Sequence, residues 1–134
     1  MSGDVGLREN ERAASADEAR WRERLVGSPL LVIAEVDGEA CGLVAGDIER
    51  DTGEPILISL WVNPRFRGRG VAKALITEVE EWAAAEHGEL SLSVRDDNAA
   101  ARGLYEDLGY EVVGPTPLAD DEHPEVTMRK TFES

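Results

Sequence analysis

Residues 56–87 pass from an apolar run straight into a helical repeat through a short turn rich in arginine and glycine. The run ILISLWV at 56–62 predicts a strand buried on both faces. After the turn, apolar residues recur at helical spacing from Val71 to about His87, where Gly88 ends the predicted helix. A buried strand that leads directly into an amphipathic helix requires a layered α/β fold, because each element must bury a face against the other.

The rest of the chain predicts further strands and helices on both sides of this unit. The expected strands are 30–36, 40–48, 89–94, 110–114 and 125–132, and the expected helices are 15–26 and 96–108. Asp37 and Gly38 join the first two strands as a hairpin turn, because both residues tolerate positive φ. Hairpins and crossovers both occur, so we expect a single domain over residues 1–134 with a mixed, mostly antiparallel central sheet flanked by helices. Residues 1–14 are expected to be flexible or irregular.

The turn at residues 63–70, NPRFRGRG, has the features of an anion-binding site. It precedes a helix N-terminus, which carries unpaired N–H groups and about half a positive charge. Gly68 and Gly70 let the backbone approach a ligand closely, and three arginines add positive charge. We therefore expect the amides of residues 67–72 to hold a phosphate group. The alternative is an ordinary strand-to-helix turn with surface arginines.

Two common phosphate-binding motifs do not fit this turn. It lacks the Gly-Lys-Ser/Thr ending of a nucleoside-triphosphate loop and the third glycine of a dinucleotide fingerprint. An unrelated type of phosphate-binding domain stays open as a distant alternative.

The chain is strongly acidic, with 28 Asp and Glu against 14 Lys and Arg and a formal net charge of -14. This charge disfavours general nucleic-acid binding, because phosphate backbones need a basic face. We favour a solvated acidic surface, as in proteins of a salty cytoplasm; a field that attracts a cationic substrate is the alternative.

Other features limit the location and the cofactors that we expect. No apolar run is long enough to span a membrane, and the first ten residues are too polar for a signal peptide. The single cysteine, Cys41, sits in an apolar run as a core residue and cannot form an internal disulfide, which favours a cytoplasmic location. His87 and His123 are too far apart in the chain to suggest a metal site, so no metal is expected.

Two motifs together resemble the GNAT N-acetyltransferase superfamily. Residues 65–70, with the pattern R-x-x-G-x-G, resemble the loop that binds the pyrophosphate of acyl-CoA in that family. Residues 98–110, about thirty residues later, are similar to the family helix N-x-x-A-x-x-x-Y-x-x-x-G-[FY]. The resemblance covers roughly residues 20–132. It implies a V-shaped cleft where the strand before the loop splays from its neighbour, and acetyl-CoA (coenzyme A) as the cosubstrate.

The resemblance also implies which residues contact the cofactor. The backbone of residues 60–62 would bind the pantetheine arm, the amides of residues 67–72 the pyrophosphate, and Asn98 the pantetheine end. The full expected set is Leu60, Trp61, Val62, Arg67, Gly68, Arg69, Gly70, Val71, Ala72 and Asn98. Asn98 has an alternative role as a helix cap, and the side chain of Trp61 could line the acceptor side of the cleft.

Tyr105 matches the family tyrosine that lies near the thioester sulfur, so the resemblance implies a catalytic role for it. A tyrosine hydroxyl can protonate the leaving thiolate, and a backbone N–H of Val62 or Trp61 can stabilise the oxyanion. An aromatic residue packed on the core is the alternative for Tyr105. The strand 56–62 carries no carboxylate, so the general base is open; the candidate relays are Glu54, Glu35, Asp47 and Glu111.

The implied activity is transfer of an acetyl group from acetyl-CoA to a primary amine, by direct attack in a ternary complex. The acceptor would be a small molecule or a peptide, with no nucleic-acid or membrane partner. The alternative is a non-catalytic acyl-CoA-binding module of the same fold, which the missing strand carboxylate keeps open.

The N-terminal part departs from the family pattern. Only eighteen residues precede Ala19, so we expect the first strand and first helix to be shortened or missing, with Val5 and Leu7 giving at most a stub of strand. The strand 30–36 would then keep an unpaired apolar edge, which leads us to expect a homodimer that covers it. The alternative is a start codon assigned too late, which would make this sequence part of a longer chain.

Overall fold

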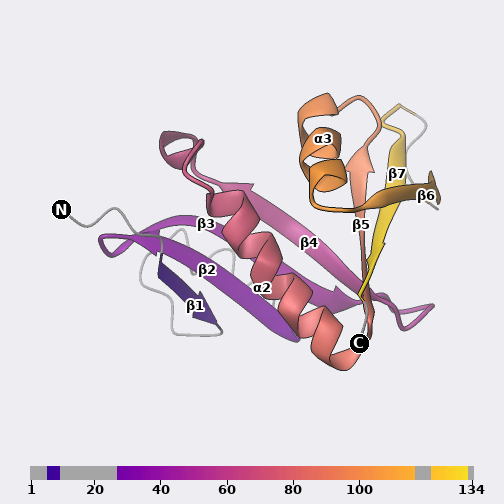
Figure 1. Cartoon of the computed structure of the whole chain (residues 1–134), viewed down its shortest axis with the longest axis horizontal. Coiled ribbons are helices and arrows are strands. Elements are labelled where there is room, and N and C mark those ends of the chain that lie inside the picture. The colour runs from indigo at the N-terminus through magenta and orange to yellow at the C-terminus, as the bar shows by residue number, and fades with distance from the viewer. Residues whose placement is uncertain (1–5, 10–26, 117–121, 133–134) are drawn as a thin grey trace.

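The structure is a computed structural model that describes residues 6–9, 27–116 and 122–132. The strands in these ranges are β1 (Gly6–Glu9), β2 (Leu30–Val36), β3 (Glu39–Ile48), β4 (Pro55–Val62), β5 (Glu89–Arg95), β6 (Glu111–Pro115) and β7 (Glu125–Thr131). The helices are the short 3-10 helix η1 (Pro64–Phe66) and the α-helices α2 (Val71–Glu86) and α3 (Ala99–Asp107) (Figure 1). The predicted helix 15–26 lies outside the described residues.

The described strands form one sheet in the order β1-β2-β3-β4-β5-β7-β6. Neighbouring strands are antiparallel except for β4 and β5, which run parallel. This confirms the predicted mixed, mostly antiparallel sheet. The hairpin at Asp37 and Gly38 is also as predicted, since both residues have positive φ, 52° and 81°.

The first strand is short but present, and this corrects two expectations. In β1, Leu7 lies opposite Ala34 and Glu9 lies opposite Val32 of β2. The strand 30–36 therefore does not have an unpaired edge, and residues 6–9 are not irregular. Four residues are too few to show an alternating pattern, and pairing satisfies the backbone groups of β2 whatever the side chains are. The edge of strand 30–36 that was expected to be covered by a homodimer is covered by β1 of the same chain.

Helix α2 covers one face of the sheet and forms the main core with it (Figure 1). Its buried side chains are those of Val71, Leu75, Ile76, Val79 and Ala83, the helical spacing expected from the sequence. The helix can lie close to β3 because a glycine stands at the contact: a Cβ atom at Gly46 would lie 2.8 Å from the Trp82 ring.

A smaller apolar cluster occupies the opposite face of the sheet, where Leu31, Ile33, Leu43 and Ala45 are buried. Cys41 is fully buried and free, as expected for a core residue. Within the described ranges, no helix has the length and apolar character needed to cross a membrane.

Candidate active site

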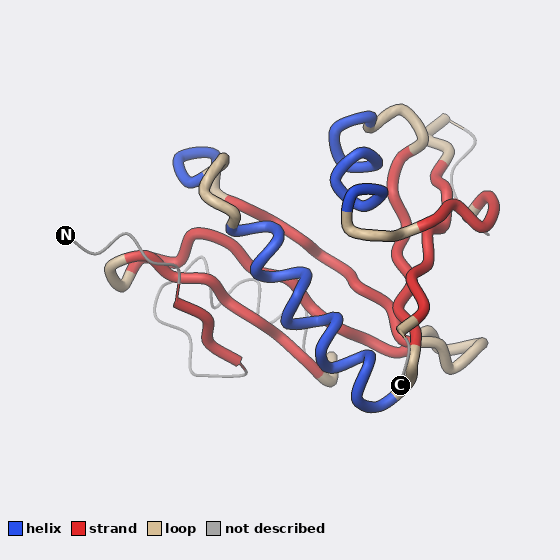
Figure 2. The backbone as a smooth tube through the Cα atoms, in the orientation of Figure 1, coloured by secondary structure: helices blue, strands red, loops and turns tan. Residues whose placement is uncertain are grey.

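Strands β4 and β5 separate soon after they begin to pair. Their register contains a single pair, Ile56 with Ser91, and beyond it the two strands diverge (Figures 1 and 2). Helix α3 stands beside the far part of β5, apart from α2 (Figure 2). The cleft here has a volume of about 1240 Å³ and is lined from β4, β5, α3, β6 and β7. The predicted V-shaped cleft is therefore present.

Strand β4 contains a bulge where it borders this cleft. Ala45 of β3 lies opposite Ile58, whereas Leu43 lies opposite Trp61, so β4 has one more residue than β3 over this interval. Ser59, inside the bulge, has φ of 59°, which is uncommon for a residue with a side chain. A bulged residue leaves backbone groups without a ladder partner, and Ser59 and Leu60 both line the cleft. The sequence did not predict this bulge, because no glycine or proline marks it.

The pairing pattern next to the bulge decides which backbone amides face the cleft. Asn63 N–H donates to the carbonyl oxygen of Cys41 at 2.8 Å. Hydrogen-bonded and non-hydrogen-bonded pairs alternate along an antiparallel ladder, so Trp61 opposite Leu43 is hydrogen-bonded to β3. The N–H of Val62 therefore points away from β3 and toward the splayed side. Of the two amides predicted to stabilise an oxyanion, Val62 is the better placed.

The turn between β4 and α2 presents a row of free amides. Asn63 accepts a hydrogen bond from Arg65 N–H at 3.0 Å and so begins η1. Gly68 and Gly70 have φ of 80° and 77°, which favours glycine at both positions. The N-cap of α2 is Gly70, with no side-chain cap, and the first bond of the helix runs from Ala74 N–H to Gly70 oxygen.

The amides of residues 68–73 have no backbone acceptor among the described residues. The predicted range of 67–72 is wrong at its first residue, because Arg67 N–H donates to the carbonyl oxygen of Pro64 at 3.4 Å. Apart from the two chain neighbours of each glycine, no described atom lies within 4 Å of the Cβ position of Gly68 or Gly70, so there is open space above the turn. Unpaired amides at a helix N-terminus beside open space form a ready anion-binding site.

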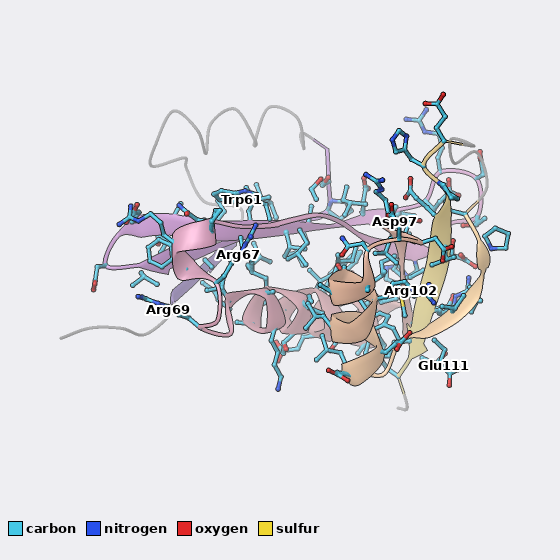
Figure 3. The ribbon with its side chains drawn as sticks, turned by 90° about the horizontal axis from the view of Figure 1, so that it is seen from above. Trp61, Arg67, Arg69, Asp97, Arg102 and Glu111 are labelled. Carbon is cyan, nitrogen blue, oxygen red and sulfur yellow. The ribbon has the colours of Figure 1, made fainter. Side chains whose placement is uncertain are left out.

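The arginines of the turn remain available to an anion. The Arg69 guanidinium stacks 5.3 Å from the ring of buried Phe66, and Arg65 pairs with exposed Glu39 at 3.3 Å. Arg67 and Arg69 leave the turn in different directions (Figure 3), and neither forms an ion pair with a described carboxylate.

Tyr105 lines the cleft from α3 and is only 7% exposed. Its ring packs edge-to-face against Tyr110 with centroids 5.8 Å apart. The hydroxyl makes no hydrogen bond to another described residue. Burial raises the pKa of Tyr105, so the phenol holds its proton at neutral pH. The residue is thus both part of the core and part of the cleft wall.

Asn98 and Trp61 have clear structural placements. The Asn98 side chain accepts a hydrogen bond from Ala101 N–H at 3.1 Å, which caps α3, and the residue also lines the cleft. The Trp61 side chain is 37% exposed and lies on the face of the sheet opposite α2 (Figure 3). Trp61 is not among the residues that line the cleft.

Among the four candidate relays, only Glu54 lines the cleft. Arg129 of β7 donates to Glu54 at 3.2 Å and to the Ser91 hydroxyl at 2.9 Å. Sequence reasoning missed this contact, because Arg129 and Glu54 are 75 positions apart and no motif contains both. The structure does not bring Glu35, Asp47 or Glu111 into the cleft; Glu111, for example, projects from the outer strand β6 (Figure 3).

Carboxylates line the cleft near both of its ends. Glu49, Asp51 and Glu54 lie before β4 begins, whereas Glu125 lies opposite Arg95 at the far end of β5. The two arginines of the lining, Arg95 and Arg129, are ion-paired. Loop amides of Asp51 and Thr52 donate to Glu49 and lower its pKa, so it stays ionised at neutral pH. Over the ranges that the structure describes, no three His, Cys, Asp or Glu residues gather as a metal site would require.

A splayed parallel strand pair, a glycine turn and a free helix N-terminus lie next to one another in this fold, and sequence comparison identifies the family. Residues 6–110 match the model of the acetyltransferase (GNAT) family, and the chain belongs to that family. It is 42% identical over 85 residues to an acetyltransferase of Pectobacterium atrosepticum, a match that spans 63% of this chain and 59% of that relative.

Solved structures share the fold. A nourseothricin acetyltransferase is 25% identical with a TM-score of 0.67, over 78% of this chain and 65% of the other. A GNAT family acetyltransferase from Elizabethkingia anophelis, solved with acetyl-CoA bound, has a TM-score of 0.74 over 97% of this chain and 99% of the other. The latter is 12% identical, so it shows the likeness of the folds alone.

Proposed function

We propose that the protein is an N-acetyltransferase that moves an acetyl group from acetyl-CoA to a primary amine by direct attack in a ternary complex. The observation that carries this proposal is the set of free amides at residues 68–73, at the start of the helix beside a cleft that a buried, protonated Tyr105 lines. The first feature suits the pyrophosphate and the second suits the leaving thiolate.

The cofactor would lie along one side of the cleft. Its pyrophosphate would accept hydrogen bonds from the amides of residues 68–73, with Arg67 and Arg69 adding positive charge. The pantetheine arm would pair with β4 at Leu60 and Val62, along the edge of β4 that is not paired with β5. An extended ligand that pairs with a strand edge gains backbone hydrogen bonds without needing particular side chains.

The chemistry follows from the groups at the mouth of the splay. The amine nitrogen forms a bond to the thioester carbonyl carbon, and the N–H of Val62 stabilises the oxyanion that develops. When the carbon–sulfur bond breaks, the sulfur takes the electron pair and receives a proton from the Tyr105 hydroxyl. The amine loses its proton to water, and water later restores the proton of Tyr105. Glu54, the candidate relay that lines the cleft, lies before β4 at the end where β4 and β5 pair, so water molecules would have to connect it to the reacting amine.

The carboxylates in the lining of the cleft support a cationic acceptor. The ionised Glu49, with Asp51 beside it in the loop before β4 and Glu125 at the far end of β5, would attract an amine that carries further positive charge. A small amine and a basic peptide terminus both meet this requirement.

A non-catalytic acyl-CoA-binding module is the second candidate. It is favoured by the absence of a carboxylate from residues 56–62, the strand that borders the reacting carbonyl in the proposed complex. In such a module the amides of residues 68–73 would hold the cofactor, but no acceptor would be acetylated.

The Tyr105→Phe variant tests the proposed chemistry. It keeps the ring in the core and removes the acidic proton, so turnover should fall about a hundredfold or more while affinity for CoA is kept. Thiol release from acetyl-CoA measures turnover, and calorimetry measures CoA binding. Wild-type turnover in a folded variant would show that Tyr105 is structural only.

A further inference from the structure

Behind Tyr105 lies a second buried tyrosine that the proposed chemistry does not use. Tyr110 is 2% exposed, and its ring meets the ring of Tyr105 at an interplanar angle of 69°. Its backbone N–H donates to the carbonyl oxygen of Tyr105 at 2.9 Å. Tyr110 therefore contacts Tyr105 through both its backbone and its ring.

Tyr110 is itself held by a charged pair from two other elements. Its hydroxyl donates to Glu80 of α2 at 2.8 Å, and Lys130 of β7 donates to the same carboxylate oxygen at 3.3 Å. The Lys130 ammonium also lies 5.8 Å from the centroid of the Tyr110 ring. The Glu80 side chain is 14% exposed, so this carboxylate is largely removed from water.

We propose that Glu80, Tyr110 and Lys130 act as a clamp that positions the Tyr105 ring for proton transfer. The inference rests on the proposed function of Tyr105. The Tyr105 hydroxyl has no hydrogen-bond partner among the described residues, so the orientation of the ring depends on packing. The Tyr105 ring packs against the Tyr110 ring, and the Tyr110 ring is in turn held in place by the hydrogen bond from its hydroxyl to Glu80.

The clamp also connects both parts of the proposed cofactor site, the amides for the pyrophosphate and Tyr105, to the same helix, α2. Helix α2 presents its N-terminus at Gly70 and Glu80 ten residues later, about 15 Å along the helix axis. The amides at the first point are proposed to hold the pyrophosphate, and the carboxylate at the second fixes Tyr110. The distance between the pyrophosphate and the Tyr105 hydroxyl is thereby set by a helix rather than by loops.

A purely structural ion pair is the competing explanation for Glu80 and Lys130. A structural pair would stabilise the fold without changing how Tyr105 lies or how fast it donates a proton. Substitutions that keep or remove the hydrogen bond to Tyr110 separate the two explanations.

Tyrosine NMR provides a test that needs no acceptor. The chain contains two tyrosines, so a sample labelled with 13C at the tyrosine ζ carbon gives two lines, which Tyr110→Phe assigns. We expect Glu80→Leu to shift or broaden the Tyr105 line and Glu80→Gln, which keeps a hydrogen-bond acceptor, to leave it near the wild-type position. Glu81→Leu, a change at the exposed neighbour on the same helix, is the matched control.

An unchanged Tyr105 line in folded Glu80→Leu would overturn the proposal. If Glu80→Leu does not fold, the comparison moves to Tyr110→Phe, which keeps the ring and loses only the hydroxyl. An unchanged Tyr105 line in that variant would overturn the proposal in the same way.

A double-mutant cycle supplies the kinetic test. We expect Tyr110→Phe to lower kcat about tenfold with KM for acetyl-CoA unchanged, since small misplacements of a catalytic group are costly. The Tyr105→Phe/Tyr110→Phe protein should then be no slower than Tyr105→Phe, because the clamp acts only through Tyr105. Independent, multiplying losses would contradict the clamp.

The cycle separates failure of the clamp from failure of the proposed function. Full activity in Tyr105→Phe would contradict both the proposed role of Tyr105 as the acid and the clamp. Low activity in Tyr105→Phe together with full activity in Tyr110→Phe would contradict the clamp but agree with Tyr105 as the acid.

Discussion

The fold opposes ionisation of both Tyr105 and Tyr110. Burial raises the pKa of both hydroxyls, and the hydrogen bond from Tyr110 to the carboxylate of Glu80 raises its pKa further. Each phenol therefore loses its proton at higher pH in the folded protein than in the unfolded chain, where tyrosine has a pKa of about 10.

Stability should consequently depend on pH in the alkaline range. The folded state holds these two protons more tightly, so their contribution is fully present below pH of about 10 and is lost as pH rises above it. We expect the free energy of unfolding to fall above that pH, and to fall less steeply in Tyr110→Phe. Urea unfolding at a series of pH values measures this. An identical alkaline slope in both proteins would show that Tyr110 does not carry the effect.

At the scale of elements, the turn at residues 63–70 joins a bulged strand to an uncapped helix. Gly68 is needed there for its positive φ, and a ligand needs the open space above it. Both requirements come from backbone geometry, so they can be tested without removing any charged group.

Gly68→Val should weaken CoA binding strongly, because a β-branched side chain opposes positive φ and occupies the space that the pyrophosphate needs. Gly103→Ala is the matched control, since Gly103 lies inside α3, has no described atom within 4 Å of its Cβ position and does not have a positive φ. Calorimetric titration with CoA gives both affinities. An affinity for CoA equal to that of the wild-type protein in a folded Gly68→Val variant would show that the turn is not part of the cofactor site.

The sequence predicted the elements that carry a strong pattern. The strand 30–36 and the helix beginning at Val71 follow from apolar periodicity, and the turn follows from its glycines. The bulge at Ser59 was not predicted, because its positive φ is imposed by the mismatch between β3 and β4 and not by residue type. Strand β1 was expected as at most a stub at Val5 and Leu7, and its pairing with β2 was not predicted, because four residues are too few to show a period.

The candidate site was predicted in the same uneven way. Residues 68–72 and Tyr105 lie in local motifs, so their positions could be read from the chain. The contact of Glu54 with Arg129 and that of Glu80 with Tyr110 join residues far apart in the sequence, and such pairs depend on the tertiary fold.

At the scale of the whole molecule, a net charge of -14 accompanies four carboxylates in the lining of the cleft. A field of this sign raises the local concentration of cations and opposes anions. In the proposed complex the amides and arginines of the turn would hold the anionic cofactor, whereas the molecule as a whole would favour a cationic acceptor.

Ionic strength should therefore affect the acceptor. We expect kcat/KM for a cationic amine acceptor to fall as salt is raised, because the Debye length shrinks from about 30 Å at 0.01 M to about 10 Å at 0.1 M. An acceptor with no charge besides the reacting amine is the control and should respond less. The same salt response for both acceptors would favour the acidic surface as a solvated face only.

The most direct test of the account is amine-dependent release of thiol from acetyl-CoA, measured with a panel of primary amines and followed by mass spectrometry of the products. We expect at least one amine to accelerate thiol release and gain one acetyl group, and we expect Tyr105→Phe and Gly68→Val both to lose most of this activity. Binding of CoA with no amine-dependent release across the panel would contradict it, and would identify the protein as a non-catalytic acyl-CoA-binding module.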